Sequence, residues 1–173
     1  MKITKCRNCK GSELLKLFSF GKISFTGKFA KNKKLNIKKT PLDLVMCENC
    51  RLVQLKHNYN LKYLYGPDYG YRTGINQTMS KHVKEITKIL IKKTKISYKE
   101  YILDIASNDG TLLKCYNKKY STFGIDPLVN KYKKNYKDID FKISDFFSKE
   151  KILKKTEKKF KIITALAVFY DLD

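Results

Sequence analysis

The sequence has no tryptophan, only three prolines and no apolar run that approaches the length of a membrane helix. A helix that crosses a bilayer needs about 20 consecutive apolar residues, so no transmembrane segment is expected. The first ten residues also lack the apolar stretch of a secretory signal. We therefore expect a soluble cytoplasmic protein without a membrane partner.

Acidic residues and arginine are scarce as well. Lysine and arginine total 38 against 16 acidic residues, a formal net charge of +22, yet the only arginines are Arg7, Arg51 and Arg72. Arginine grips phosphates and base edges with paired hydrogen bonds, whereas lysine is a hydrated point charge. The excess therefore indicates a compositional drift toward lysine, and we expect no specific nucleic-acid partner. Salt-sensitive binding of nucleic acid or another polyanion stays open as the alternative.

What the sequence does have is enough apolar surface for a packed core. Its 173 residues are 42% apolar and 13% aromatic, which excludes disorder throughout the chain. The length suits one ordinary domain or two small ones.

Four of the five cysteines form two Cys-x-x-Cys pairs, Cys6 with Cys9 and Cys47 with Cys50. Two thiolates three positions apart on a tight turn can bind one ion, and two such turns supply the four ligands of a tetrahedral zinc site. A redox role for either pair is the alternative, but neither pair precedes a helix in a strand-rich context. The fifth cysteine, Cys115, is expected to pack in the interior.

The first module is predicted to span residues 1–60 and to bind this zinc. Short apolar runs at residues 14–18, 41–46 and 52–55 predict strands joined by loops. So short a segment buries little core by itself. The metal must supply the difference, because closing a four-ligand zinc site contributes on the order of 10 kcal/mol to folding.

A linker over residues 61–97 follows. Its first part, residues 63–74, is rich in tyrosine and glycine and predicts a loop that serves as a binding or catalytic lid. The alternative is that these tyrosines pack the seam between two modules. Apolar residues from Ile75 to Leu90 then recur at steps of three and four residues, which predicts an amphipathic helix.

The last module, residues 98–173, alternates apolar strands with polar loops. Strands are predicted at residues 101–106, 122–125, 141–143 and 162–168, with a helix after Gly110. Such alternation is typical of a parallel sheet. The expected fold class is therefore α/β: an N-terminal zinc-binding module followed by the first half of a Rossmann-like, doubly wound sheet.

Polar residues follow the first two of these strands. Residues 107–110, Ser-Asn-Asp-Gly, form a loop after the first strand, and Asp126 comes directly after the second. A glycine-containing loop lets a cofactor approach the backbone, and an acid at the next strand tip can accept both hydroxyls of a ribose. Asp109 disfavours the pyrophosphate of a dinucleotide, whereas the sulfonium of S-adenosylmethionine suits an acidic loop. The alternative is a plain turn without a ligand.

The order of these motifs resembles that of the sugar C-methyltransferases. The match covers nearly the whole chain and combines both cysteine pairs with six further segments: residues 41–44 and 52–55 around the second pair, then residues 71–79, 103–113, 124–127 and 169–172. The resemblance implies a zinc-binding domain, an S-adenosylmethionine-binding Rossmann-like domain and a further C-terminal domain. It also implies methyl transfer to the carbon beside the ketone of a nucleotide-linked 4-keto sugar, after a base removes the proton there.

The resemblance assigns roles to individual residues. The zinc ligands would be Cys6, Cys9, Cys47 and Cys50. Asp126 would take the ribose of S-adenosylmethionine, and Tyr69 or Tyr71 would enter the active site. The remaining cofactor-binding residues would be Asp104, Ser107, Asn108, Asp109, Gly110, Pro127, Asp145 and Phe146.

The family pattern continues beyond Asp173, where this sequence stops. We therefore expect an N-terminal fragment that is inactive alone, with a missing C-terminal domain or a second chain completing the sheet. The rival hypothesis is a non-catalytic zinc-binding module that binds nucleic acid or another polyanion through its lysine excess.

Overall fold

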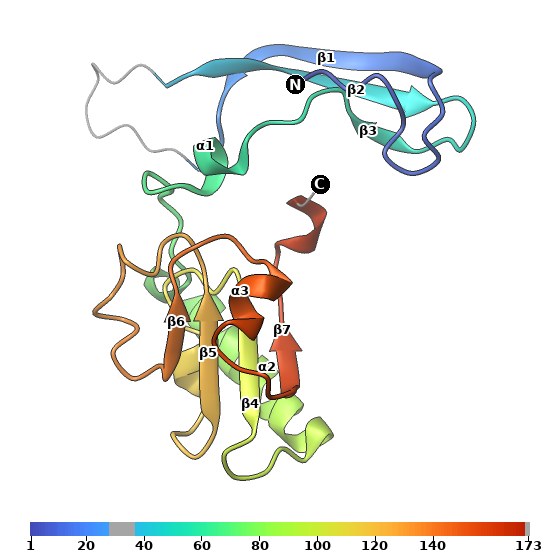
Figure 1. Ribbon diagram of the computed structural model, residues 1–173. Helices are drawn as coiled ribbons and strands as arrows, with labels where there is room; N and C mark the ends of the chain where they lie inside the picture. The colour runs from blue at the N-terminus through green and yellow to red at the C-terminus, as the bar shows by residue number, and fades with distance from the viewer. Residues whose placement is uncertain (28–36, 172–173) are drawn as a thin grey trace. The chain divides into compact units, whose positions relative to one another are not determined.

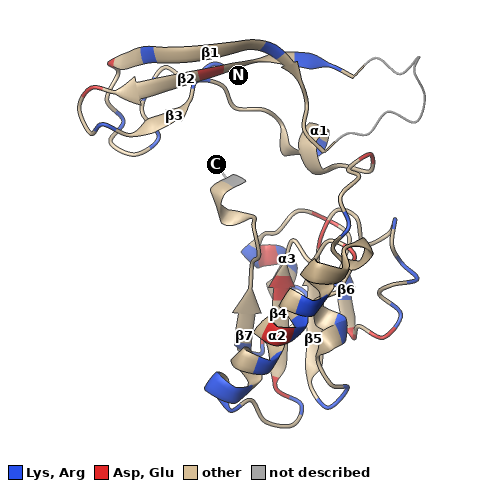
Figure 2. Cartoon of the chain, turned by 180° about the vertical axis from the view of Figure 1, so that it is seen from behind, with Lys and Arg blue, Asp and Glu red and all other residues tan. Residues whose placement is uncertain are grey.

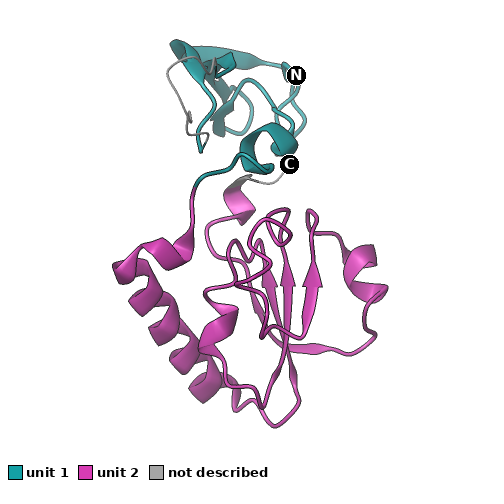
Figure 3. Ribbon diagram, turned by 90° about the vertical axis from the view of Figure 1, so that its left-hand side faces the viewer, with its two compact units in different colours: residues 1–70, 173 teal, residues 71–172 magenta. Residues whose placement is uncertain are grey.

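The computed structural model describes residues 1–27 and 37–171, and the chain divides into two compact units. The first unit holds Met1–Gly70, and the second begins at Tyr71 (Figure 3). The division falls inside the expected linker, so the amphipathic helix of that linker belongs to the second unit. Among the described residues, no helix is both long enough and apolar enough to span a membrane.

The first unit is built on a three-stranded antiparallel sheet in the order β1-β2-β3 (Figure 1). The strands are β1 (Leu14–Ser24), β2 (Lys39–Cys47) and β3 (Val53–Leu55), and the short helix α1 (Leu61–Tyr65) follows them. The strand predictions for this module are confirmed. β1 is longer than predicted and carries two irregularities, between Lys16 and Phe18 and between Ser19 and Lys22.

The two faces of this small sheet differ. Val45 and Cys47 of β2 and Gln54 of β3 are buried on one face. On the other face, Leu15 and Val53 flank Met46 in one cross-strand row and remain 47% and 50% exposed. The unit therefore concentrates its burial on the face that holds the cysteines.

The second unit contains a four-stranded parallel sheet in the order β6-β5-β4-β7. Its strands are β4 (Tyr101–Ile105), β5 (Ser121–Ile125), β6 (Phe141–Ile143) and β7 (Phe160–Thr164). Helix α2 (Gln77–Thr94) and helix α3 (Lys149–Leu153) complete it. The mixed α/β prediction is confirmed, and so are three of the four strand positions.

Both faces of the central strand β4 are buried, as expected for a parallel sheet covered on two sides. Ile102 packs with Val83 of α2 in one apolar cluster, while Leu103 packs with Ile152 of α3 in another. The alternation of Ile102 and Leu103 thus places the sheet between two layers. The exposed side of α2 carries lysines, and Figure 2 shows that lysine and arginine occur in both units.

Two predictions for the second unit are wrong. The helix expected after Gly110 is only a short 3-10 turn, Leu113–Cys115, because the backbone of Tyr116 is already extended, with ψ of 146°. The strand expected to reach Val168 ends at Thr164. Ala167, with φ of 53°, lies in the left-handed region, which a strand residue does not adopt.

Candidate functional site

The two Cys-x-x-Cys turns of the first unit share one backbone geometry. The carbonyl of Cys6 accepts the Lys10 N–H at 3.1 Å, and the carbonyl of Cys47 accepts the Arg51 N–H at 2.9 Å. Lys10 and Arg51 both have positive φ, 63° and 61°. Each turn therefore presents its two sulfurs in the same way, although the turns are far apart in the sequence.

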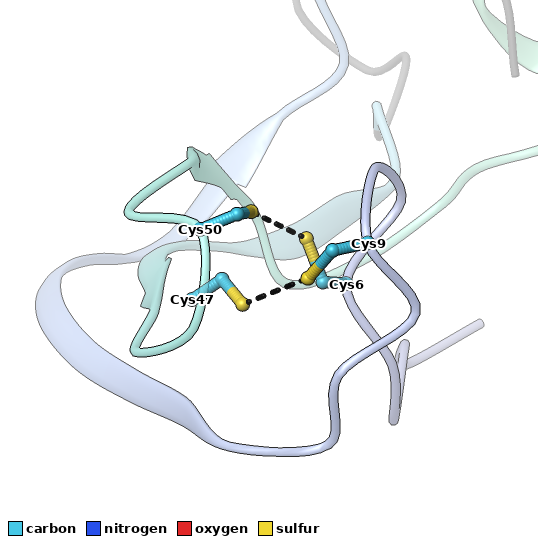
Figure 4. Close-up of side chains that lie close together, drawn as sticks. All are labelled: Cys6, Cys9, Cys47 and Cys50. Atoms are coloured by element: carbon cyan, nitrogen blue, oxygen red, sulfur yellow. Dashed lines mark hydrogen bonds between the residues drawn. The ribbon is translucent and has the colours of Figure 1, made fainter.

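The four sulfurs of these turns meet at one point (Figure 4). All lie within 4.8 Å of one another; Cys6 Sγ is 3.6 Å from Cys50 Sγ, and Cys9 Sγ is 3.5 Å from Cys47 Sγ. Sulfurs about 2.3 Å from a tetrahedral zinc would be about 3.8 Å apart, so these spacings fit the ion. The cysteines are not disulfide-bonded. They form a candidate zinc site, as the sequence predicts.

Ionisation of these thiols is uneven. Burial opposes ionisation of Cys6, but hydrogen bonds from the Cys9 backbone and the Gln54 side chain lower its pKa to about 6. For Cys47 the Cys50 backbone favours the thiolate, yet burial and the neighbouring sulfur of Cys9 outweigh it and raise the pKa to about 11. Four thiolates this close need a cation, because like charges oppose one another's ionisation.

The second candidate site lies at the carboxyl ends of β4 and β5, where ligands of parallel sheets bind. The loop from Ser107 to Gly110 follows β4, and its Asn108 and Gly110 have positive φ of 52° and 74°. A Cβ on Gly110 would lie 2.9 Å from Ile139 Cδ1. The backbone path, with its positive φ, thus favours a glycine at position 110.

Asp126, at the tip of β5, supports this loop. Its Oδ2 accepts the Asn108 N–H at 2.9 Å, and its Oδ1 accepts the Leu128 N–H at 2.7 Å. Burial raises the pKa of Asp126 to about 6 despite these two bonds, and the charge of Asp109 adds to the rise. The carboxylate predicted to take a ribose therefore also joins the two strand tips.

Asp104 lies within β4, below the loop. It is buried, and the Thr164 hydroxyl of β7 donates to its Oδ1 at 2.6 Å. Burial raises the pKa of Asp104 to about 7, since the hydrogen bond from Thr164 only partly compensates for lost solvation and the charge of Asp126 opposes ionisation. Asp104 is thus a buried acid within the sheet, between β4 and β7, rather than part of the loop after β4.

Asp109 is fully buried and is held by residues 72–74, which we call the clasp. Arg72 Nε lies 3.5 Å from Asp109 Oδ2, and the Gly74 N–H donates to the same oxygen at 3.2 Å. The Thr73 N–H donates to Asn108 Oδ1 at 3.0 Å. The expected acidic loop is therefore already paired with a cation of its own chain.

The sequence predicted a lid over residues 63–74 but not the pairing of the clasp with the loop after β4, and it assigned no role to Tyr136. The Tyr136 hydroxyl lies 2.7 Å from Ser107 Oγ and donates to the Asn108 carbonyl at 3.0 Å, so it supports the loop from below. The one signal for the clasp was the rarity of arginine. In a lysine-rich chain, Arg72 is the side chain whose guanidinium stacks on the Tyr132 ring, 4.8 Å from its centroid.

Asp145 and Phe146, two of the predicted cofactor-binding residues, follow β6. Asp145 forms an ion pair with Lys151 of α3 at 2.6 Å, and its Oδ1 accepts the Phe146 N–H at 2.7 Å. The Ser144 hydroxyl donates to the Pro127 carbonyl at 3.3 Å. The structure therefore connects the tips of β5 and β6 at the same sheet edge.

The two predicted active-site tyrosines belong to different units. Tyr69, in the first unit, packs its ring near Tyr65, with centroids 5.2 Å apart. Tyr71, in the second unit, directly precedes the clasp, and its carbonyl accepts the Asn108 side-chain amide at 3.1 Å. Its ring is 42% exposed. Tyr71 is thus anchored by its backbone to the loop after β4.

Comparison with known proteins supports the zinc site of the first unit. Residues 6–65 match a family model described as "Putative zinc binding domain". Over 131 residues the chain is 24% identical to the C-methyltransferase NovU of Streptomyces niveus, a match that covers 74% of this chain and 31% of that protein. The chain spans about a third of that relative's length. Both findings confirm the resemblance to C-methyltransferases and support a methyltransferase-related function.

Proposed function

We propose that this chain is the zinc-binding and cofactor-binding part of an S-adenosylmethionine-dependent C-methyltransferase that acts on a nucleotide-linked keto sugar. The observation that carries the proposal is the polar loop at residues 107–110, which follows the central strand of a parallel sheet and bonds to Asp126 at the next strand tip. The similarity to a C-methyltransferase supports it. In this proposal the sheet is the first half of a Rossmann-like domain.

The residues present fit S-adenosylmethionine. When bound, the cofactor would supply an electrophilic methyl group on a sulfonium. The loop and Asp104 would hold its methionine end, Asp126 its ribose, and the Asp145–Phe146 turn its adenine. Each Asp126 oxygen accepts one backbone N–H and keeps a second lone pair for a hydroxyl.

Tyr71 would act on the sugar. A phenol on an exposed ring can donate a hydrogen bond to a ketone oxygen and stabilise the negative charge that develops there. A phenol is a poor base at neutral pH. The proton beside the ketone is therefore removed by another group. Tyr69 is the second candidate for this donor.

Calorimetry on the zinc-loaded chain tests the proposal. We expect S-adenosylmethionine and its demethylated product to bind more tightly than NAD. Asp126→Asn should weaken the binding at least about tenfold, as expected when hydrogen bonds to a charged acceptor are lost. Asp138→Asn is the matched control, because Asp138 is an exposed acid of the same unit, and it should change nothing.

Salt separates this proposal from polyanion binding. Cofactor affinity should survive roughly 0.5 M salt, whereas phosphate-driven binding should collapse. Tighter binding of NAD, or no cofactor binding by the folded chain alongside salt-sensitive binding of nucleic acid, would reject the methyltransferase proposal.

A further inference from the structure

The buried side chain of Gln54 lies against the cysteine cluster of the first unit. Gln54 belongs to β3, is paired with Val45 of β2 and is only 7% exposed. Its Nε2 donates a hydrogen bond to Cys6 Sγ at 3.2 Å. A buried amide must find partners for both its oxygen and its nitrogen, so the surroundings of the oxygen matter as well.

Arg7 determines which end of the Gln54 amide faces the sulfur. The Arg7 backbone N–H and its Nη1 both donate to Gln54 Oε1, at 3.0 Å and 3.2 Å. Both groups are donors only, so a reversed amide would place its N–H₂ against two donors. The oxygen therefore faces Arg7, and an N–H faces Cys6.

Arg7 is itself fixed in place. Its Nη1 also donates to the Leu55 carbonyl at 2.6 Å, and its Nη2 donates to Asn58 Oδ1. A chain of hydrogen bonds thus runs from the end of β3 through the Arg7 guanidinium and the Gln54 amide to one sulfur. Arg7 follows Cys6 directly, so this chain also connects the first cysteine turn to β3.

We propose that Gln54 is a positioning residue of the zinc site, with Arg7 holding its amide. The inference rests on the candidate zinc site and concerns how tightly that site holds its ion. The amide N–H orients the Cys6 thiolate and accepts part of its negative charge. Outer hydrogen-bond partners of metal ligands change metal affinity by roughly 10- to 100-fold when they are removed.

Gln54→Glu tests the proposal with a minimal change of shape. The glutamate keeps an acceptor oxygen for Arg7, but it replaces the N–H that faces Cys6 Sγ with a second oxygen. We expect zinc affinity, measured by competition with a chelator, to fall roughly 10- to 100-fold. Gln77→Glu is the matched control, because Gln77 is an exposed glutamine of α2 in the other unit. The zinc affinity of this variant should equal that of the unsubstituted chain.

Cobalt substitution supplies a readout that a purely structural role would not move. A hydrogen bond to a thiolate stabilises its electrons, so removing the bond should shift the sulfur-to-cobalt charge-transfer bands of Gln54→Glu to lower energy. Unchanged bands together with unchanged zinc affinity would overturn the proposal. Failure of the unsubstituted chain to bind any metal would instead contradict the zinc site itself.

A measurement on the unsubstituted protein covers the case in which Gln54→Glu fails to fold. In the chain loaded with cadmium-113, we expect a scalar coupling across the hydrogen bond between the metal and one Gln54 side-chain amide proton. Its absence in the fully loaded, folded protein would overturn the proposal.

Discussion

The sheets of the two units differ most in what they bury. In the second unit, β4 buries Ile102 and Leu103 on opposite faces, and apolar clusters cover both sides. In the first unit, β2 and β3 bury one face, where Val45 lies beside Cys47 and Gln54, and leave the other partly exposed. The smaller sheet thus replaces part of an apolar core with four sulfurs and the ion that they fit.

The buried polar groups of the two units also differ in what satisfies them. The first unit gathers cysteines whose thiolates require a cation. The second buries Asp104, Asp109 and Asp126 and satisfies them with Thr164, the clasp and backbone N–H groups of its own loops. We therefore expect the first unit to depend on a metal for its stability, whereas the second is held by its own core and hydrogen bonds.

Metal removal should have the largest effect on stability, and it should act on the first unit alone. Stripping zinc with a chelator, or making Cys47→Ser, is expected to unfold the first unit, because a closed zinc site contributes on the order of 10 kcal/mol. The second unit should keep its amide protection in hydrogen exchange. Cys115→Ser, in the second unit, is the control and should leave zinc content unchanged. A first unit that stays folded without metal would contradict this expectation.

The second largest effect should be that of pH on the free energy of unfolding of the second unit. The pKa of Asp104 is raised to about 7, so between about pH 4 and pH 7 the folded state binds more protons than the unfolded state. The free energy of unfolding should therefore fall as the pH rises, by roughly 4 kcal/mol from this group.

Asp104→Asn keeps an acceptor for Thr164 and should remove this group's share of the slope, while Asp126, whose pKa is raised to about 6, keeps its own share. Hydrogen exchange of the β4 amides at a series of pH values measures it. Asp138→Asn, at an exposed acid, should leave the slope in place. Equal slopes for the unsubstituted chain and Asp104→Asn would refute the assignment.

A truncation in the core of the second unit should lower the stability of that unit and leave the first unit unchanged. Ile102 has no exposed surface, and Ile102→Ala should destabilise the second unit by about 3 kcal/mol through lost burial and the cavity left behind. Chemical denaturation followed by circular dichroism measures the change. Zinc content should stay the same. Loss of zinc from this variant would show that the two units do not fold independently.

The clasp should give the smallest of these effects. Arg72→Met leaves the Asp109 carboxylate buried without its cation, and we expect a loss of about 2 kcal/mol in the second unit, less than for a fully buried pair because Arg72 is 35% exposed. Lys118→Met removes a surface pair with Asp138 and should cost under about 1 kcal/mol. Adding Asp109→Asn should recover much of the Arg72→Met loss. Equal effects for the two single variants would argue against the clasp.

Much of this structure follows from local patterns in the sequence. The spacing of the four cysteines predicts a zinc site because ligand geometry restricts thiolates to a few spacings. The apolar runs at residues 101–106 and 122–125 predict buried parallel strands, because strands covered on both faces need apolar residues throughout. The amphipathic helix is confirmed as α2 by its steps of three and four residues.

Other features depend on contacts between distant residues. Helical spacing after Gly110 predicts a helix, yet the extended backbone of Tyr116 ends the segment early. Nothing local shows that Arg72 pairs with Asp109, 37 positions away, or that Arg7 orients Gln54 toward Cys6. Periodicity records which side chains are buried, whereas the partner of each buried polar group depends on which strands lie side by side. The sequence by itself determined the cysteine cluster and the positions of most strands, because both follow from local spacing; only the tertiary structure decided how their polar neighbours are satisfied.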